Sequence, residues 1–252
     1  MWRNFSHNLR EKKAWLGIIL PLWVFGSFIF VQVIVGLIYG GLQAAGVPFE
    51  GINSAVFSTV LGAIVYALTL LMVIGLPWLA RSHRTSLKEV GLDRGPNWLE
   101  LLLAPVGLIV YLILSAALVA LAMQFLTFVD FNQTQDVGFT GISQRFELML
   151  AFIMLVVIAP VAEEVLFRGY LFGKLRQHIP LWIAILITSV LFAIVHGAWN
   201  VGIDVFALSI ILCLLRVVTG SLWPSILLHM LKNGIAFYLL FINPNLLTTL
   251  GG

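Results

Sequence analysis

The sequence predicts an all-α, polytopic membrane protein: a transmembrane helical bundle of about seven spans. Two observations predict this class. Hydrophobic residues make up 61% of the 252 residues and charged residues only 10%, whereas soluble domains carry about a quarter charged residues. The apolar residues also form blocks, and three of these approach or exceed the roughly 20 residues that a helix needs to cross a bilayer. These blocks are residues 15–45, 55–80 and 98–129.

Seven spans follow from the apolar blocks and from the Gly and Pro residues that separate them. They are residues 15–43, 54–79, 98–128, 146–168, 181–198, 203–219 and 223–241. The first is about twice as long as the apolar stretch of a cleavable signal peptide, so it is expected to remain as an anchor. An amphipathic extension, residues 169–178, is expected to prolong the fourth span. Residues 1–252 are therefore predicted to form a single membrane domain, with three spans without motifs in 1–145 and a motif-bearing core in 146–241.

The placement of Lys and Arg predicts the orientation of the bundle. Most of the 14 basic residues fall on one side of the predicted spans. They are Arg3, Arg10, Lys12, Lys13, Arg81, Arg84, Lys88, Arg94, Arg168, Lys174 and Arg176. Because cytoplasmic loops carry an excess of Lys and Arg, we expect the N-terminus inside and the C-terminus outside. The net charge of +3 is too small to predict a nucleic-acid partner, and the single Cys213 excludes an internal disulfide.

Adjacent carboxylates in the fourth span are the first indication of a functional site. A charge at the centre of a bilayer costs at least about 2.5–3.5 kcal/mol, so such residues face a partner or a wet cavity. Glu164 and Arg168 are four residues apart, within reach of an ion pair. Glu163 lies about 100° around the helix from Glu164. The residue four positions after it is Phe167, not a cation. Glu164 is thus the anchored carboxylate and Glu163 the free one, which suits a general base; the alternative is a purely structural Glu–Arg clamp.

Two imidazoles and an amide follow on later spans. Phe192 and His196 are predicted to share a face of the fifth span, and His229 and Asn233 a face of the seventh. His supplies a proton that exchanges near neutrality, and Asn supplies N–H donors of the kind that a developing oxyanion requires. Separately, each His could be a hydrogen-bonded packing residue that joins helices. The convergence of these side chains with Glu163 on three helices favours a hydrolytic site.

Three motifs carry a resemblance to a known family. They are Glu163-Glu164-Val-Leu-Phe-Arg168, Phe192-Ala-Ile-Val-His196 and His229-Met-Leu-Lys-Asn233. Together, in this order on successive helices, they resemble the signature of the CAAX-type intramembrane endopeptidases. This CPBP or Abi family includes the prenyl-protein endopeptidase and bacteriocin-immunity relatives. The resemblance covers about residues 146–241.

The resemblance implies a role for each motif residue. Glu163 would activate the attacking water with the help of His196, and His229 and Asn233 would stabilise the oxyanion. Three further residues would support these groups. Glu164 and Arg168 would hold the helix that bears Glu163, and Phe192 would be a packing residue that shapes the substrate pocket around His196.

The cofactor requirement has two interpretations. Glu163, His196 and His229 could form the three-ligand set of a catalytic zinc with an open position. However, the chain has no His-Glu-x-x-His pair at helix spacing. The resemblance implies a glutamate-activated water without a bound metal, and we favour that interpretation.

Three functions are compatible with these residues. The favoured one is an endopeptidase of the bacterial or archaeal plasma membrane that cleaves a membrane-associated, in some cases lipidated, peptide or protein. A non-catalytic adaptor or immunity protein would keep the same helices as a scaffold. A proton-coupled transporter would be expected to show internal repeats and broken helices, which the sequence lacks.

One expectation concerns how Glu163 and His196 meet. With straight spans they would lie near opposite ends of the bundle. We predict that the fourth span continues, embedded, through residues 169–178 and so brings them together.

Overall fold

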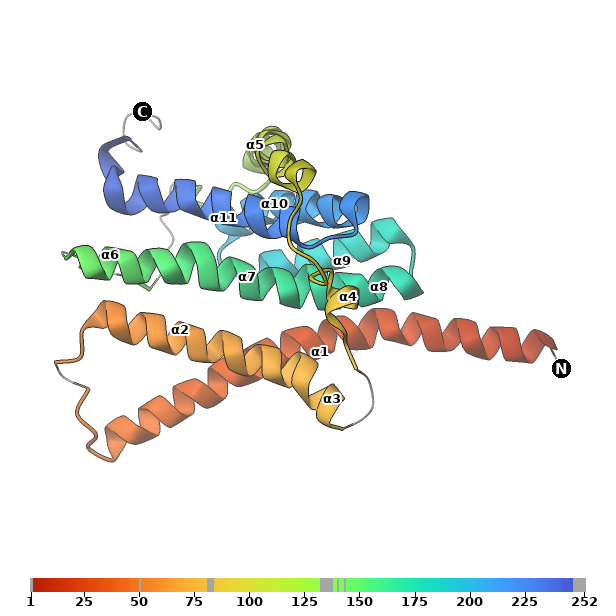
Figure 1. Ribbon diagram of the computed structural model, residues 1–252, viewed down its shortest axis with the longest axis horizontal. Helices are drawn as coiled ribbons and strands as arrows, with labels where there is room; N and C mark the ends of the chain where they lie inside the picture. The colour runs from red at the N-terminus through yellow and green to blue at the C-terminus, as the bar shows by residue number, and fades with distance from the viewer. Residues whose placement is uncertain are drawn as a thin grey trace.

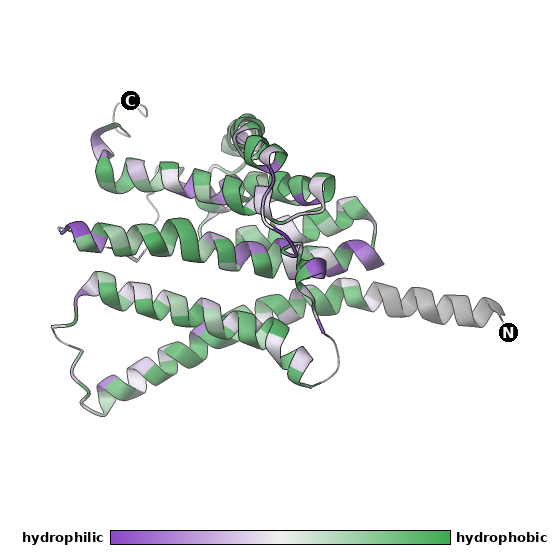
Figure 2. Ribbon diagram, viewed as in Figure 1, coloured by the Kyte–Doolittle hydropathy of each residue, from purple (hydrophilic) through white to green (hydrophobic). Residues whose placement is uncertain are grey.

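The computed structural model describes residues 2–49, 51–80, 84–131, 138–139, 141–142 and 144–246, with side chains described from residue 15 onward. Every regular element among these residues is helical, which confirms the all-α class. Six helical stretches are long and apolar enough to cross a membrane. They are Trp15–Ala44, Ser54–Leu79, Trp98–Phe125, Arg145–His178, Trp199–Thr219 and Trp223–Ile242. With the shorter apolar helix Leu181–Ile194, they are consistent with about seven spans, and apolar residues run along the length of most helices (Figure 2).

The first two spans are the long helix α1 (Trp2–Ala44) and the stretch formed by α2 (Ser54–Leu70), η1 (Leu71–Gly75) and α3 (Leu76–Leu79). The π-helical turn η1 ends at Gly75, two residues before Pro77. Pro lacks an N–H and crowds the carbonyl four residues earlier, so a wider turn is the expected response. That carbonyl, of Val73, instead accepts a hydrogen bond from the indole of Trp23 at 3.2 Å. The contact fixes α1 against the second span.

The motif-bearing span is a single helical stretch from Arg145 to His178. Its parts are α6 (Arg145–Phe152), η2 (Ile153–Ile158), α7 (Ala159–Glu164), η3 (Val165–Leu171) and α8 (Phe172–His178). The predicted continuation through 169–178 is confirmed. At about 1.5 Å per residue the stretch is about 50 Å long, well beyond the roughly 30 Å of bilayer hydrocarbon. Glu163 consequently lies near its middle, away from either end.

The next helix, α9 (Leu181–Ile194), is shorter than predicted. Its 14 residues span about 21 Å, and the predicted span 181–198 is therefore wrong in its last residues. The chain turns at Gly197, whose φ of 71° lies in the left-handed region that favours glycine at helix ends. His196 is thus in the turn after α9 and not on the helix. The following helix, α10 (Trp199–Thr219), begins earlier than expected.

A polar cluster joins the third span to two of the C-terminal spans. It lies between α5 (Trp98–Phe125), α10 and the last span, which consists of α11 (Trp223–Phe237) and η4 (Tyr238–Ile242). Asp204 of α10 accepts hydrogen bonds from Tyr111 and Ser115 of α5, both at 2.6 Å. Its other carboxylate oxygen lies 3.4 Å from the ammonium of Lys232 on α11. The cluster gives each of these polar groups a partner within the bundle.

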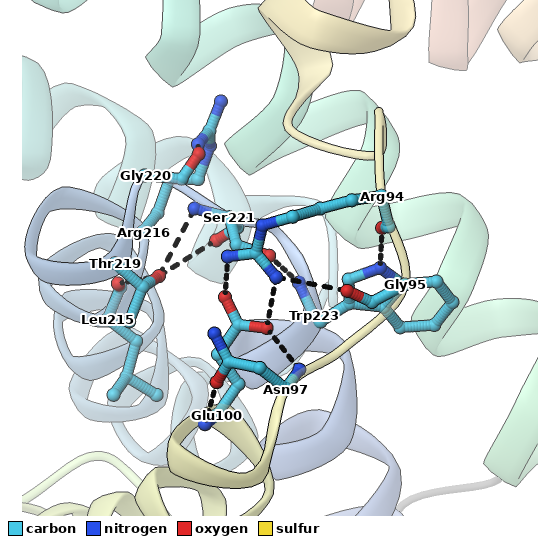
Figure 3. A network of polar contacts seen from close by, with 10 residues as sticks. All are labelled: Arg94, Gly95, Asn97, Glu100, Leu215, Arg216, Thr219, Gly220, Ser221 and Trp223. Carbon is cyan, nitrogen blue, oxygen red and sulfur yellow. Dashed lines mark hydrogen bonds and ion pairs between the residues drawn. The ribbon is translucent and has the colours of Figure 1, made fainter.

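Residues 84–97, which include the short helix α4 (Leu87–Val90), are held against the turn between α10 and α11. The indole of Trp223 donates a hydrogen bond of 2.6 Å to the carbonyl of Arg94. The Arg94 guanidinium faces Glu100 at 2.6 and 2.9 Å (Figure 3), and this hydrogen-bonded pair raises the pKa of Arg94. The buried guanidinium of Arg216 donates to the carbonyls of Glu89, at 2.9 Å, and of Gly220. These bonds order one end of the bundle.

The connections between the helices lie at two opposite ends of the bundle. The start of α1, α3, α4 and the end of α8 lie toward one end, and the loop after α1, the start of α6 and the end of the last span toward the other (Figure 1). The basic connections thus gather at the first end, as the charge-based orientation requires. Which side of the membrane this end faces remains a prediction.

Candidate active site

Glu164 is the centre of a buried charge network. Its carboxylate and the Arg168 guanidinium are both fully buried, and Arg168 Nη1 lies 2.8 Å from Glu164 Oε1. The predicted ion pair is therefore present. The same oxygen is 2.9 Å from Nδ1 of His229, which reaches it from α11. Because a carboxylate only accepts hydrogen bonds, Nδ1 carries the proton in this contact. Glu164 thus orients both the His229 ring and the Arg168 guanidinium.

Glu163 lies on the adjacent position of α7 and remains partly exposed. The exposed fraction of its side chain is 15%, against 0% for Glu164, so the two carboxylates differ as predicted. Glu163 Oε2 is 3.8 Å from Nε2 of His229, too far for a direct hydrogen bond. A water molecule beside both atoms could bond to both. The other carboxylate oxygen of Glu163, Oε1, accepts a hydrogen bond from the hydroxyl of Tyr66 on α2.

His196 reaches the site from the turn after α9. Its Nδ1 lies 2.7 Å from the carbonyl oxygen of Phe192, and since a carbonyl cannot donate, Nδ1 is the protonated nitrogen and Nε2 is left as an acceptor. The rings of His196 and His229 both pack edge-on against the ring of Phe192. The structure therefore brings His196 to the same site. The shared helical face predicted for Phe192 and His196 is wrong, because α9 ends at Ile194.

Phe192 packs at the centre of the motif residues. Its fully buried ring lies under the Arg168 guanidinium, with 4.1 Å between Cζ and the ring centroid, a cation–π contact. The ring centroids of His196 and His229 are 4.8 and 5.8 Å from it, both in edge-on arrangements. Phe192 thus contacts all three motifs and fixes the spacing of the two imidazoles.

Asn233 lies one turn beyond His229 on α11 and contacts the long motif-bearing helix. Its Nδ2 donates a hydrogen bond of 2.9 Å to the carbonyl of Leu155 in η2. The amide nitrogen carries two hydrogens, so one remains for a ligand. The structure places Asn233 on the same helix as His229, and its role toward an oxyanion stays a prediction.

A metal at this site was the alternative interpretation. Across the residues for which coordinates are described, no group of three or more His, Cys, Asp or Glu side chains is arranged to hold a metal ion. One nitrogen of His229 is already engaged by Glu164, which leaves Nε2 as its only candidate ligand atom. The cofactor requirement itself stays a prediction.

Two features of the site were not predicted. Tyr66 comes from a span without motifs, and nothing in its sequence context marks it; only the rule that a buried Tyr hydroxyl needs a partner would have pointed to it. The second feature is an apolar pocket of about 560 Å³ between α5, α9 and α10. Gly197 and Ala198, which directly follow His196, form part of its wall together with Ala122 of α5. An apolar cavity thus opens beside the His196 turn.

The fold and this site define a class: a multi-pass integral membrane protein with a carboxylate–imidazole centre inside its helical bundle. Residues 145–235 match the family model described as type II CAAX prenyl endopeptidase Rce1-like. The matched region contains all three motifs. The resemblance predicted from these motifs is therefore confirmed, and it covers the C-terminal core.

Bacterial proteins show the same similarity. The chain is 30% identical over 142 residues to the membrane-embedded CAAX protease MroQ of Staphylococcus aureus, covering 51% of this chain and 58% of that protein. It is 37% identical over 67 residues to the UPF0177 protein YxdF of Lactococcus lactis (27% of this chain, 36% of that protein). It is 31% identical over 84 residues to the putative membrane peptidase YdiL of Bacillus subtilis (33% and 34%). The chain thus spans between about a third and three-fifths of the length of these relatives. No solved structure matches it.

Proposed function

We propose that the chain is an intramembrane endopeptidase that hydrolyses a peptide bond of a membrane-associated protein or peptide. The observation that carries this proposal is the position of Glu163: its free oxygen faces Nε2 of His229 at 3.8 Å, inside the bundle and beside a carboxylate that is already neutralised by Arg168. The likeness to proteins named CAAX protease and membrane peptidase supports the same reaction class.

The reaction would proceed by a water activated by a carboxylate. Glu163 takes a proton from water as the hydroxide attacks the peptide carbonyl, and the acceptor nitrogen of His196 assists in this transfer. The tetrahedral oxyanion is stabilised by the remaining N–H of Asn233 and by Nε2–H of His229. This role requires His229 as the doubly protonated imidazolium, because its Nδ1–H is already donated to Glu164. Glu163 then returns its proton to the leaving amine, which completes the hydrolysis. Glu164 and Arg168 keep the motif-bearing helix and His229 in register for these steps.

The substrate would be an apolar peptide segment in or at the bilayer. The pocket of about 560 Å³ beside the His196 turn is of ordinary size for a ligand site. Its wall, formed by residues such as Ala122, Ala198 and Phe206, is apolar. An extended peptide with its scissile bond at Glu163 could place an apolar group in this pocket. A polar side chain there would lose its hydration without a partner.

The test compares Glu163→Gln with the wild type and with Asp93→Asn, an exposed carboxylate in the connection before α5. Membranes containing each full-length variant are incubated with the membrane proteome of a deletion strain, and new peptide N-termini are identified by mass spectrometry. We expect Glu163→Gln to lose cleavage by at least about 100-fold, the usual contribution of a general base. Asp93→Asn should cleave as the wild type does.

A folded Glu163→Gln protein that cleaves normally would contradict the proposal. Biological activity that persists without any cleavage would favour the adaptor. The same reconstituted membranes test the cofactor: after treatment with a zinc chelator, activity should persist. Loss of activity that added zinc restores would favour the metal site of Glu163, His196 and His229.

A further inference from the structure

Tyr66 is a residue of the N-terminal half that contacts the proposed general base. It lies on α2, far outside the region 145–235 that matches the endopeptidase family. Its hydroxyl donates a hydrogen bond to Oε1 of Glu163. Its ring packs against the apolar cluster formed around Met154, Val156 and Ala159 of the motif-bearing helix. The hydroxyl is therefore brought to Glu163 by a packed side chain.

The two oxygens of Glu163 have different surroundings. Oε1 is taken by Tyr66, whereas Oε2 is the atom that lies 3.8 Å from His229 Nε2. The terminal torsion of a Glu side chain has broad minima, so the helix alone does not fix the plane of the carboxylate. A hydrogen bond to one oxygen fixes that plane. In its absence the carboxylate could rotate and turn Oε2 away from the imidazole.

Resting on the proposed function, we propose that Tyr66 is a positioning residue that holds the Glu163 carboxylate with Oε2 toward His229 and the attacking water. The active site would then be shared between the family-matched core and the second span. It follows that α2 supplies part of the catalytic geometry. Nothing in the three motifs indicates such a contribution.

Tyr66→Phe tests this role because it keeps the packed ring and removes only the hydroxyl. A hydrogen bond to a charged group contributes about 1.5–3 kcal/mol, which corresponds to about a 10- to 100-fold decrease in kcat. We expect this decrease in the full-length protein reconstituted in vesicles, with KM within about twofold of the wild type. The matched control is Tyr39→Phe, whose hydroxyl accepts an exposed hydrogen bond from Gln43 of α1; it should have wild-type kcat.

A double-mutant cycle separates positioning from general packing. In Glu163→Asp the carboxylate is one methylene shorter and withdraws from the Tyr66 hydroxyl. Tyr66→Phe should therefore reduce kcat far less in the Glu163→Asp background than in the wild type. A structural effect of Tyr66 would instead reduce both backgrounds equally, and comparison per folded molecule removes any difference in yield.

The outcomes distinguish the two proposals. Loss of cleavage in Glu163→Gln with normal kcat in Tyr66→Phe would overturn the positioning role and leave the endopeptidase standing. An increase in KM alone would also overturn it, since it would make Tyr66 a substrate contact. Normal cleavage by both Glu163→Gln and Tyr66→Phe would overturn both proposals.

Discussion

Glu164 shows how a single carboxylate can organise several motif residues. Its Oε1 lies within 2.9 Å of both Arg168 Nη1 and His229 Nδ1, and all three side chains are buried. Arg168 has no other ion-pair partner among the side chains described. The cationic charge is thus balanced only while Glu164 is ionised. Glu163 does not balance a buried cationic side chain in this way. Its carboxylate is partly exposed and accepts a hydrogen bond from a neutral phenol.

This difference predicts that two chemically equivalent substitutions affect stability to different extents. Glu164→Gln leaves Arg168 buried without a counter-charge, so we expect the free energy of unfolding to fall by about 3–5 kcal/mol. Glu163→Gln should leave stability nearly unchanged while it abolishes cleavage. Thermal unfolding in detergent, followed by circular dichroism, measures the first effect. Equal melting temperatures for the two variants would contradict the assignment of Glu164 as the anchored carboxylate.

Local geometry accounts for what the sequence could predict at the site. The Glu164–Arg168 pair was predictable because residues four apart on a helix are neighbours. The contacts of His229 with Glu164 and of Tyr66 with Glu163 were not, because 65 and 97 residues separate the partners. Such pairs depend on how spans pack. The motifs indicated that three helices converge, but the motif-free second span was missed.

At the level of elements, the least predictable feature is the early end of α9. Apolar residues continue through Val195, so hydropathy gives no sign that the helix ends at Ile194. The left-handed Gly197 ends it, and the resulting turn carries His196. In contrast, the continuation of the motif-bearing helix through 169–178 was predictable from its amphipathic pattern. Together, a short helix and a long one bring His196 to Glu163.

The turn after α9 is therefore a position where backbone conformation affects the reaction. An L-residue in the left-handed region costs roughly 1–2 kcal/mol, so Gly197→Ala should shift the turn and lower kcat about tenfold or more. Gly36→Ala is the control, since a Cβ there meets nothing within 4 Å and the residue is helical. Proteolysis assays in vesicles measure both variants. Wild-type kcat in Gly197→Ala would show that this turn does not set the position of His196.

For the whole molecule, the arrangement of charges predicts which end of the bundle faces the cytoplasm. Residues 84–97 and the end of α8 lie at the end that carries the basic connections, and the loop after α1 lies at the other (Figure 1). The bonds of Arg216 and Trp223 fix the first of these connections to the bundle. The side of the membrane on which residues 84–97 lie therefore gives the orientation of the whole bundle.

Cysteine labelling can measure this orientation because the chain has a single, buried Cys213. Lys88 and Val47 are both exposed. Lys88 belongs to α4 and Val47 to the loop after α1, and these two segments lie toward opposite ends of the bundle (Figure 1). A membrane-impermeant maleimide added to intact cells should label Val47→Cys, whereas Lys88→Cys should react only after permeabilisation, because basic connections stay in the cytoplasm. The wild type, whose thiol is shielded, gives the background in both conditions. Labelling of Lys88→Cys in intact cells would contradict the predicted orientation. It would show that the basic connections, together with α4 and the end of α8, lie outside the cell.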